Sequence, residues 1–563
     1  MDSTNTNGSQ SDQQRDRVFR FNAVAKRSGI DTSYVNAYPA NGSDFRLYQA
    51  NGGGLAVIDY DLDGNLDAYV AQAGGEPYKK DSVANQLFRQ TDEQFRETTQ
   101  KANVGDLGYG QGICVGDVNQ DGLPDIIVAN IGDNVLFVNQ GDGTFLQRDD
   151  KLKPGSPSWT SSIGLADLDG DHLPDLVAVN YINDPDAMTA RCKSPFDQCQ
   201  PQSYRAAKDQ FYRLSSAGTF DPIDKSSQDN FLDSDTDSRY GFGLIIANFD
   251  DRFGNDLFIS NDGDLNHFWQ STGDANEATS KTATYRLAES AALTGCAVGH
   301  LGNAQACMGV AAGDMDGNGR LDLHVCNFYG ESSNLFLQVN RGFFSDATIR
   351  RGIEPVSKQQ LGFGTQGADF DNDGRLDLFV LNGHLFDRKD GKVPFRMKPQ
   401  LLTGTETGFI DAKVESDADH ESFWERPALG RTVAQGDFNR DGRLDLICNH
   451  LDGPVELLQN QTDEAGHWVT LELVGVDSER DAIGAKVIVT NGKQKQTAWM
   501  IGGDGYMCTN EACVHIGLGS DSESIERIDI EWPSGQRQQF ANLSPDARYL
   551  VVEGSTQVFA RPE

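Results

Sequence analysis

Seven copies of one acidic nine-residue loop recur along the chain, and most of them place side-chain oxygens at positions 1, 3, 5 and 9. The first copy is Asp59-Tyr-Asp-Leu-Asp-Gly-Asn-Leu-Asp67, and an apolar, strand-like run follows each copy. Ca²⁺ accepts six to eight oxygen ligands in loose geometry, so these side chains, a main-chain carbonyl at position 7 and water can complete its shell. A solvated acidic turn also favours Asp, Asn and Gly, but the recurrence of the whole pattern favours calcium.

Six of the seven loops keep this pattern, and each is predicted to hold one structural calcium ion. The predicted ligands at positions 1, 3, 5, 7 and 9 are Asp59, Asp61, Asp63, Asn65, Asp67, Asp117, Asn119, Asp121, Leu123, Asp125, Asp167, Asp169, Asp171, Leu173, Asp175, Asp314, Asp316, Asn318, Arg320, Asp322, Asp369, Asp371, Asp373, Arg375, Asp377, Asp437, Asn439, Asp441, Arg443 and Asp445. The fourth copy, from Asn248 to Asp256, carries Arg252 at position 5. Its guanidinium is expected to pair with Asp250 and Asp256 in place of the metal, which leaves this loop free of a cation.

The composition limits the kinds of partner. The chain has 563 residues, with 48 Lys and Arg against 84 Asp and Glu, and a formal net charge of -36. This charge argues against nucleic acid or an anionic membrane surface as a partner. No run of 18 apolar residues is present, so no transmembrane segment is expected. Residues 1–17 are polar and are predicted to be disordered, with the export signal absent from the sequence.

Nine cysteines are consistent with an oxidising compartment, and the protein is expected to be secreted, periplasmic or on the cell surface. Three pairs lie close together in loop-like segments and are predicted to form disulfides: Cys192 with Cys199, Cys296 with Cys307, and Cys508 with Cys513. The remaining three cysteines, Cys114, Cys326 and Cys448, lie in apolar strand patterns, where cysteine is usually a small buried hydrophobic residue.

The spacing of the loops predicts the fold. Their starts lie 58, 50, 81, 66, 55 and 68 residues apart, and four strand patterns accompany each copy. Such a period predicts a seven-bladed, all-β propeller with calcium loops. The segment Phe19–Ile30 resembles the fourth-strand segment Phe343–Ile353 but has no loop before it. It is therefore expected to supply the outer strand that closes the last blade. The predicted propeller spans residues 18–461, and a small β-sandwich-like domain follows over residues 462–563.

Specific sequences in both regions resemble a known family. The acidic loops resemble FG-GAP/VCBS repeats, the units of integrin α-subunit propellers, and the tail looks like an ASPIC/UnbV domain. The tail residues that carry this likeness are Asp481-Ala-Ile-Gly-Ala-Lys486, Gly503-Asp-Gly-Tyr506, Ile516–Gly519 and Glu531–Gly535. Together the two regions resemble the bacterial relatives of cartilage acidic protein, which implies a secreted or surface calcium-binding protein. Met507 and Cys508 stand where that family is expected to have Ser and Gln.

A ligand site is predicted at the end of the propeller opposite the calcium loops. One residue thirteen positions after each loop start should lie there: Gln72, Asn130, Asn180, Asn261, Asn327, Asn382 and His450. These side chains suit hydrogen bonding to sugar hydroxyls, and Trp159, Phe242 and Phe363 lie near them in the predicted blades. The alternatives are that the asparagines form turns at strand ends and that the aromatic residues fill the channel as core.

Two functions remain open. The first is a non-catalytic protein for extracellular recognition or adhesion, whose ligand is a glycan or an extracellular protein. The second is a calcium-dependent lyase or hydratase acting on carbohydrate at the propeller mouth, with His300, His384, His450, Arg431 and Tyr240 as acid/base candidates. A tight pocket that holds a His or Tyr with a shifted pKa would favour the enzyme.

Overall fold

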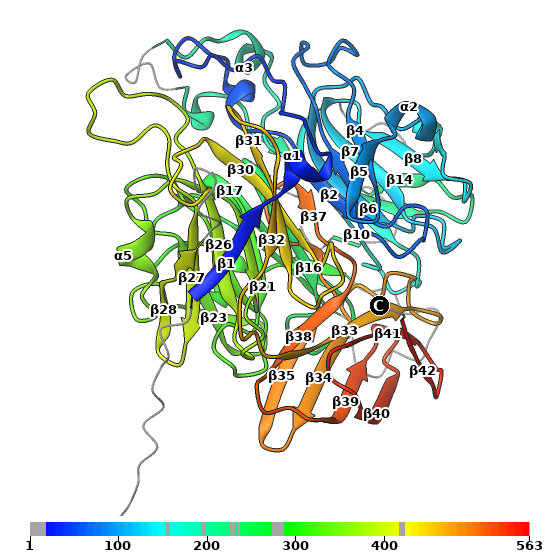
Figure 1. The fold of residues 1–563 in the computed structure, drawn as a ribbon. Coiled ribbons are helices and arrows are strands. Elements are labelled where there is room, and N and C mark those ends of the chain that lie inside the picture. Colours follow the sequence, from blue (N-terminus) through cyan, green and yellow to red (C-terminus); the bar gives the residue numbers. More distant parts are fainter. Residues whose placement is uncertain are drawn as a thin grey trace, which may run out of the picture.

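The structure is a computed structural model, and it describes residues 18–152, 158–193, 199–223, 231–232, 237–272, 286–415 and 423–561. The segment predicted to be disordered, residues 1–17, lies outside this description. The described chain is nearly all β, as predicted. Its longer, N-terminal part forms a ring of antiparallel sheets, and its C-terminal strands lie together at one side of that ring (Figure 1).

Each acidic loop joins the first two strands of a four-stranded antiparallel unit, and the second strand always begins at position 9 of the loop. Units one to three are β2 (Leu55–Ile58), β3 (Asp67–Val70), β4 (Gln86–Thr91) and β5 (Gln94–Glu97); β6 (Gly110–Gly116), β7 (Asp125–Gly132), β8 (Val135–Asn139) and β9 (Phe145–Gln147); and β10 (Ser158–Ala166), β11 (Asp175–Asn180), β13 (Gln210–Leu214) and β14 (Phe220–Ile223). Units two and three share one sheet, because β7 pairs with β10.

Units four to six follow the same order: β16 (Gly241–Ala247), β17 (Asp256–Asp264), β18 (His267–Ser271) and β19 (Leu287–Glu289); β21 (Val310–Gly313), β22 (Asp322–Val325), β23 (Asn334–Asn340) and β24 (Phe343–Asp346); and β25 (Gly362–Ala368), β26 (Asp377–Asn382), β27 (Gln400–Thr405) and β28 (Gly408–Asp411). The strands outside this order are short: β12 (Ala207–Lys208) pairs with β15 (Ser238–Arg239), and β20 (Gln305–Ala306) pairs with β17.

The seventh unit closes the ring with the N-terminal strand. It contains β30 (Gly430–Gly436), β31 (Asp445–His450) and β32 (Glu456–Asn460), and β1 (Val18–Ala23) pairs antiparallel with β32. The short strand β29 (Lys413–Glu415) pairs parallel with the other side of β1. The first strands of successive units contact one another in order, and β30 of the last unit returns to β2 of the first. Phe19 and its neighbours thus lie in the strand that pairs with β32, where the closing strand is expected.

Helices are few and short. The α-helices are α1 (Ala25–Ser28), α2 (Thr99–Ala102), α3 (Pro185–Thr189), α4 (Ala291–Thr294) and α5 (Ile353–Ser357), and single 3₁₀ turns cover Leu47–Ala50, Asp149–Lys151 and Pro201–Ser203. Each of these elements is about one turn long, so they serve as connections between strands. Among the described residues, no helix is long and apolar enough to cross a membrane.

The C-terminal strands form two sheets. One contains β38 (Val514–Gly519), β33 (His467–Val474), β41 (Ala547–Val552) and β42 (Val558–Ala560), and the other contains β35 (Gln494–Trp499), β34 (Lys486–Asn491), β39 (Ile525–Glu531) and β40 (Arg537–Leu543). Side chains of both sheets, among them Val469, Leu471, Val487 and Ile528, share one buried apolar cluster. Two sheets with a common core are the arrangement of a β-sandwich.

A segment of this C-terminal region enters the ring. Its short strand β36 (Gly502–Gly503) pairs with β16, and β37 (Cys508–Thr509) pairs with β2, where it is seen between the ring strands in Figure 1. Between these strands, the ring of Tyr506 is fully buried against Phe242 and Phe363, with centroid distances of 5.6 and 5.4 Å. The tail thus supplies part of the apolar core at the centre of the ring.

One of the three predicted disulfides is confirmed. Cys192 and Cys199 are bonded, whereas Cys296, Cys307, Cys508 and Cys513 are free thiols. Cys296 and Cys307 pack in the apolar cluster between the fourth and fifth units, and Cys508 is held in β37 by its pairing with β2. Closeness in sequence therefore did not bring the sulfur atoms of these two pairs into a bond.

Candidate metal centres

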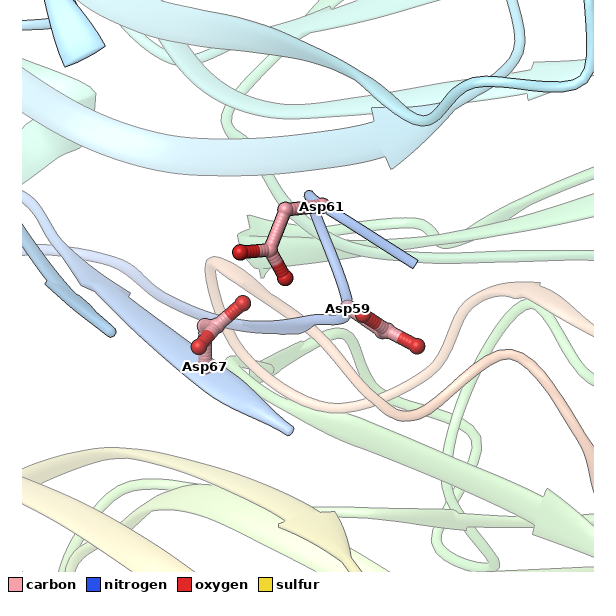
Figure 2. A group of neighbouring side chains, drawn as sticks. All are labelled: Asp59, Asp61 and Asp67. Atoms are coloured by element: carbon pink, nitrogen blue, oxygen red, sulfur yellow. The ribbon is translucent and has the colours of Figure 1, made fainter. Parts of the chain in front are cut away.

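Four of the acidic loops bring three carboxylates together. In each, the aspartates at positions 1, 3 and 9 offer oxygens that lie within 4.8 Å of one another: Asp59, Asp61 and Asp67; Asp167, Asp169 and Asp175; Asp314, Asp316 and Asp322; and Asp369, Asp371 and Asp377. Figure 2 shows the first of these groups, in which the carboxylates of Asp61 and Asp67 turn toward one another. The second and seventh loops have Asn119 and Asn439 at position 3, so each of them keeps an amide oxygen there.

Backbone hydrogen bonds hold the acidic side chains in place. In the first loop, the Asp67 carboxylate accepts from the amides of Tyr60, at 3.3 Å, and Gln90, at 2.8 Å, and Asp59 accepts from the amide of Gly64 at 3.0 Å. The same three bonds recur in the other five loops that keep the predicted pattern. The turn is thus fixed by the chain itself, and its oxygens are positioned in advance.

Burial of these carboxylates makes their charge costly. Loss of solvent, with a smaller contribution from the nearby acids of each loop, raises the pKa of Asp67 and of Asp125 to about 8. Burial raises the pKa of Asp167 to about 8 as well, with Asp169 as the next largest cause. A dication that replaces the lost solvent would relieve both effects. The donor set consists of oxygen atoms, which suits a hard cation such as Ca²⁺.

The fourth loop keeps the turn but differs in charge. Its Asp256 accepts from the amides of Phe249 and Ser271 at 3.0 and 2.7 Å, as in the other loops. The Arg252 guanidinium lies 3.6 Å from Asp250 and is two-thirds exposed. Within the described chain it forms no ion pair with Asp256, so the expected bridge to both carboxylates is only half present.

Arginines on the third strand reach two of the three-carboxylate groups. Arg89 on β4 lies 2.5 Å from Asp61 and 2.8 Å from Asp63. Arg213 on β13 lies 2.5 Å from Asp169 in the third loop. The sequence alone did not suggest a role for these arginines. In the structure, each directly precedes the residue whose amide bonds to the aspartate at position 9.

The tail contacts the loops directly, which the sequence analysis also missed. The amide of Asp117 donates to the Asp481 carboxylate at 2.9 Å, and the amide of Asp437 donates to Glu511 at 2.9 Å. Asp481 begins one of the tail sequences that carried the family resemblance. Two loops of the ring are therefore joined to the tail at position 1, where the first calcium ligand is expected.

The asparagine side chains of the predicted ring form hydrogen bonds within the chain. All five asparagines are buried, and each side-chain amide donates to the carbonyl of a following residue in the chain: Asn130 to Asp133, Asn180 to Lys208, Asn261 to Leu265, Asn327 to Ser332 and Asn382 to Lys398. These bonds hold the connection between the second and third strands. For Asn130, Asn261 and Asn327 the acceptor lies three to five residues further along the chain, as in the turn alternative, whereas Asn180 and Asn382 bond to carbonyls 28 and 16 residues away.

The aromatic residues predicted at the mouth fill the centre of the ring. Trp159, Phe242 and Phe363 are buried members of one apolar cluster that also contains Tyr506. The indole nitrogen of Trp159 donates to Gln111 at 2.8 Å. Their role is thus to pack the core, which was the alternative to ligand binding.

The five acid/base candidates differ in their exposure to solvent. His300 is exposed on a loop, while Tyr240, His384, His450 and Arg431 are buried. The Arg431 guanidinium donates to the carbonyls of Ala50 and Gly383 at 2.7 and 3.0 Å, and lies 3.9 Å above the Phe363 ring.

Burial also changes the two interior histidines. It lowers the pKa of His384 and of His450 to about 4, so both are neutral near pH 7. The pKa shift that would favour an enzyme is therefore present at both residues. His384 packs against the rings of Phe328 and Phe386, at centroid distances of 5.3 and 4.7 Å, and His450 lies 6.0 Å from the ring of Phe423.

Comparison with known proteins agrees with both regions. The FG-GAP-like repeat family matches residues 59–128, 117–178 and 314–380, and the ASPIC and UnbV family matches residues 475–558. Cartilage acidic protein 1 of Xenopus tropicalis is 26% identical over 303 residues, and that of Homo sapiens is 26% identical over 308 residues. Each match covers 53% of this chain and 42% of the relative, so the chain matches less than half the length of these relatives.

A solved structure of BBS1N in complex with ARL6DN covers 77% of this chain and 97% of that chain, with 10% identity and a TM-score of 0.40, which is too low to bear on function. The chain carries FG-GAP-like repeats followed by a C-terminal ASPIC and UnbV region, and it is similar to cartilage acidic protein 1.

Proposed function

We propose that this protein is a calcium-loaded extracellular recognition protein, in which about six structural Ca²⁺ ions stiffen the ring over residues 18–461 and the tail of residues 462–563 covers part of the loop-bearing face. The observation that carries the proposal is the recurrence of three-carboxylate groups at one position of the repeated unit. The FG-GAP-like repeats support the same reading.

The charge and cysteine pattern support an extracellular setting. The net charge of -36 is tolerable where bound dications neutralise part of it. A disulfide between Cys192 and Cys199 is stable in an oxidising compartment. The ligand is expected to be a glycan or an extracellular protein. The enzyme alternative is weaker, because its five candidate residues are separated between an exposed loop and the core.

Calcium removal tests the proposal. A cation that binds only the folded protein stabilises it by mass action, by about 2.7 kcal/mol for each site at a free concentration 100 times its Kd. We expect the melting temperature to fall in excess chelator and to recover with Ca²⁺ but not with equimolar Mg²⁺, which binds such loose sites less readily. Metal analysis after dialysis should return about six ions per chain. An unchanged melting temperature in chelator would contradict structural calcium.

A further inference from the structure

A groove of about 710 Å³ lies between the seventh loop and the start of the tail. Its walls come from the seventh loop, the N-terminal strand β1, the connection into β33 and the turn before β41, and include Arg20, Asn439, Asp441, Asp463, Trp468 and Asp546. This volume falls within the range of roughly 300–1,000 Å³ that is usual for small-ligand sites. The groove is separate from the closed centre of the ring.

An aromatic side chain is fixed at one wall. Trp468 is half-buried, and its ring stacks on His515 with centroids 5.9 Å apart and an interplanar angle of 22°. His515 is held in turn, because its Nδ1 lies 2.9 Å from Thr470 Oγ1 and its Nε2 lies 2.9 Å from Asn372 Oδ1. Gly442, at φ +79°, leaves room for the indole, since a Cβ there would lie 1.9 Å from it. The indole therefore has little freedom to move.

Paired donors and acceptors surround this indole. Arg20 lies 2.8 Å from Asp463, and His467 lies 2.6 Å from Asp546, with the Arg20 and His467 side chains each more than a third exposed. The second Asp546 oxygen accepts from the amide of Trp468 at 3.3 Å. Such pairs present several hydrogen-bond donors and acceptors around one apolar surface, which is the pattern that a polyhydroxylated ring requires.

The charge of the lining argues for a neutral ligand. Two arginines line the groove against four acids, namely Asp441, Asp463, Glu464 and Asp546. Asn439 and Asp441 are also predicted ligands of the seventh loop, so a dication there would balance the two excess negative charges. A strongly charged ligand of either sign would meet no net opposite charge in the loaded protein.

We propose that this groove binds a neutral oligosaccharide, with the apolar face of one sugar ring on Trp468 and its hydroxyls bonded to the Arg20–Asp463 and His467–Asp546 pairs. The inference rests on the proposed recognition function and names its ligand class and its site. It places recognition beside the seventh loop, away from the ring of asparagines.

The test uses the full chain in Ca²⁺. Tri- to pentasaccharides of glucose, galactose, mannose and N-acetylglucosamine, with oligosaccharides of hyaluronan as the acidic comparison, are titrated by calorimetry and by tryptophan fluorescence. We expect at least one neutral oligosaccharide to bind and to change the fluorescence. Trp468→Ala should weaken that binding about tenfold or more, since a stacked aromatic contact of this size is worth roughly that factor.

Further variants separate the loss of the binding site from a general loss of folding. Phe559→Ala removes an exposed aromatic side chain of the tail that does not line the groove, and it should leave binding unchanged. Arg20→Gln and Asp546→Asn alter the polar walls without touching the indole, and each should weaken binding several-fold if Trp468→Ala fails to fold. Binding of the hyaluronan oligosaccharides alone, no binding by any neutral oligosaccharide, or equal binding by all variants would overturn the proposal. Calcium content and melting temperature, measured on the same samples, report separately on the proposed function.

Discussion

The first and fifth loops have the same geometry but different charge. Each brings aspartates from positions 1, 3 and 9 together. In each, the aspartate at position 9 accepts two backbone bonds, of 3.3 and 2.8 Å at Asp67 and of 2.9 and 2.7 Å at Asp322. The turn is thus independent of the charge around it.

The third strand makes the difference. Arg89 precedes the residue whose amide bonds to Asp67, and its guanidinium pairs with Asp61 and Asp63. Leu337 stands at the matching place in the fifth unit and packs in an apolar cluster. The first loop is therefore partly neutralised by a guanidinium of the third strand, whereas within the described residues no ion pair reaches the fifth-loop carboxylates Asp314, Asp316 and Asp322. Calcium should bind the fifth loop more tightly, because no such ion pair competes for its carboxylates.

Removal of one predicted calcium ligand from each loop should give the largest difference in stability between the first and fifth loops. Asp316→Ala removes position 3 of the fifth loop, and Asp61→Ala removes it from the first. We expect Asp316→Ala to lose about 2.7 kcal/mol of calcium-dependent stability, the contribution of one well-occupied site, and Asp61→Ala to lose about half as much. Denaturant unfolding with and without Ca²⁺ measures both. Equal losses would show that Arg89 does not weaken the first site.

Removal of Arg89 should strengthen calcium binding at the first loop, by less free energy than the loss of a ligand costs. Arg89→Leu introduces the residue found at the matching place in the fifth unit. It should tighten calcium binding at the first loop about tenfold, or about 1.4 kcal/mol. This energy lies between the interaction energies of two unit charges in water and near a protein surface. Arg96→Leu is the matched control, because Arg96 lies opposite Arg89 in the strand pair and forms no ion pair within the described chain. Calcium titration followed by calorimetry distinguishes the two. A similar shift in both variants would indicate a general effect of net charge.

Much of this arrangement was predictable from the sequence, because its causes are local. A nine-residue turn with oxygens at fixed positions depends on its own residues, so the grouping of carboxylates at positions 1, 3 and 9 and the order of strands followed from the repeat. The closing strand β1 followed from the likeness of Phe19–Ile30 to another outer strand. Contacts between distant segments did not follow. The insertion of Tyr506 between Phe242 and Phe363, and the bond from the Asp117 amide to Asp481, join parts of the chain that share no local pattern.

The candidate ligand site shows the same limit. The spacing identified the asparagines that follow each loop, of which Asn180 and Asn382 end their strands. It could not show that the following connection accepts their amides, as Ser332 does for Asn327. The groove beside Trp468 depends on β1, the seventh loop and the tail meeting in space. A pattern along one segment therefore predicts which groups are available, while burial decides which of them remain accessible.

The fourth loop offers the smallest and most direct test of the comparison, because it has the turn without the full charge. Asn248→Asp combined with Arg252→Asp restores acids at positions 1 and 5, and Asp250 and Asp256 already occupy positions 3 and 9. The double variant should bind one more calcium ion than the parent. Its gain in stability should be modest, about 1 kcal/mol for a site occupied only a few-fold above its Kd, since Lys486 and Arg341 lie 2.9 and 3.4 Å from Asp251 in the same loop. Arg252→Asp alone is the control, because it leaves an amide at position 1. If the double variant binds no further ion, correct turn geometry with restored acids is not sufficient for a calcium site, and the arginines and lysine around each loop decide its occupancy.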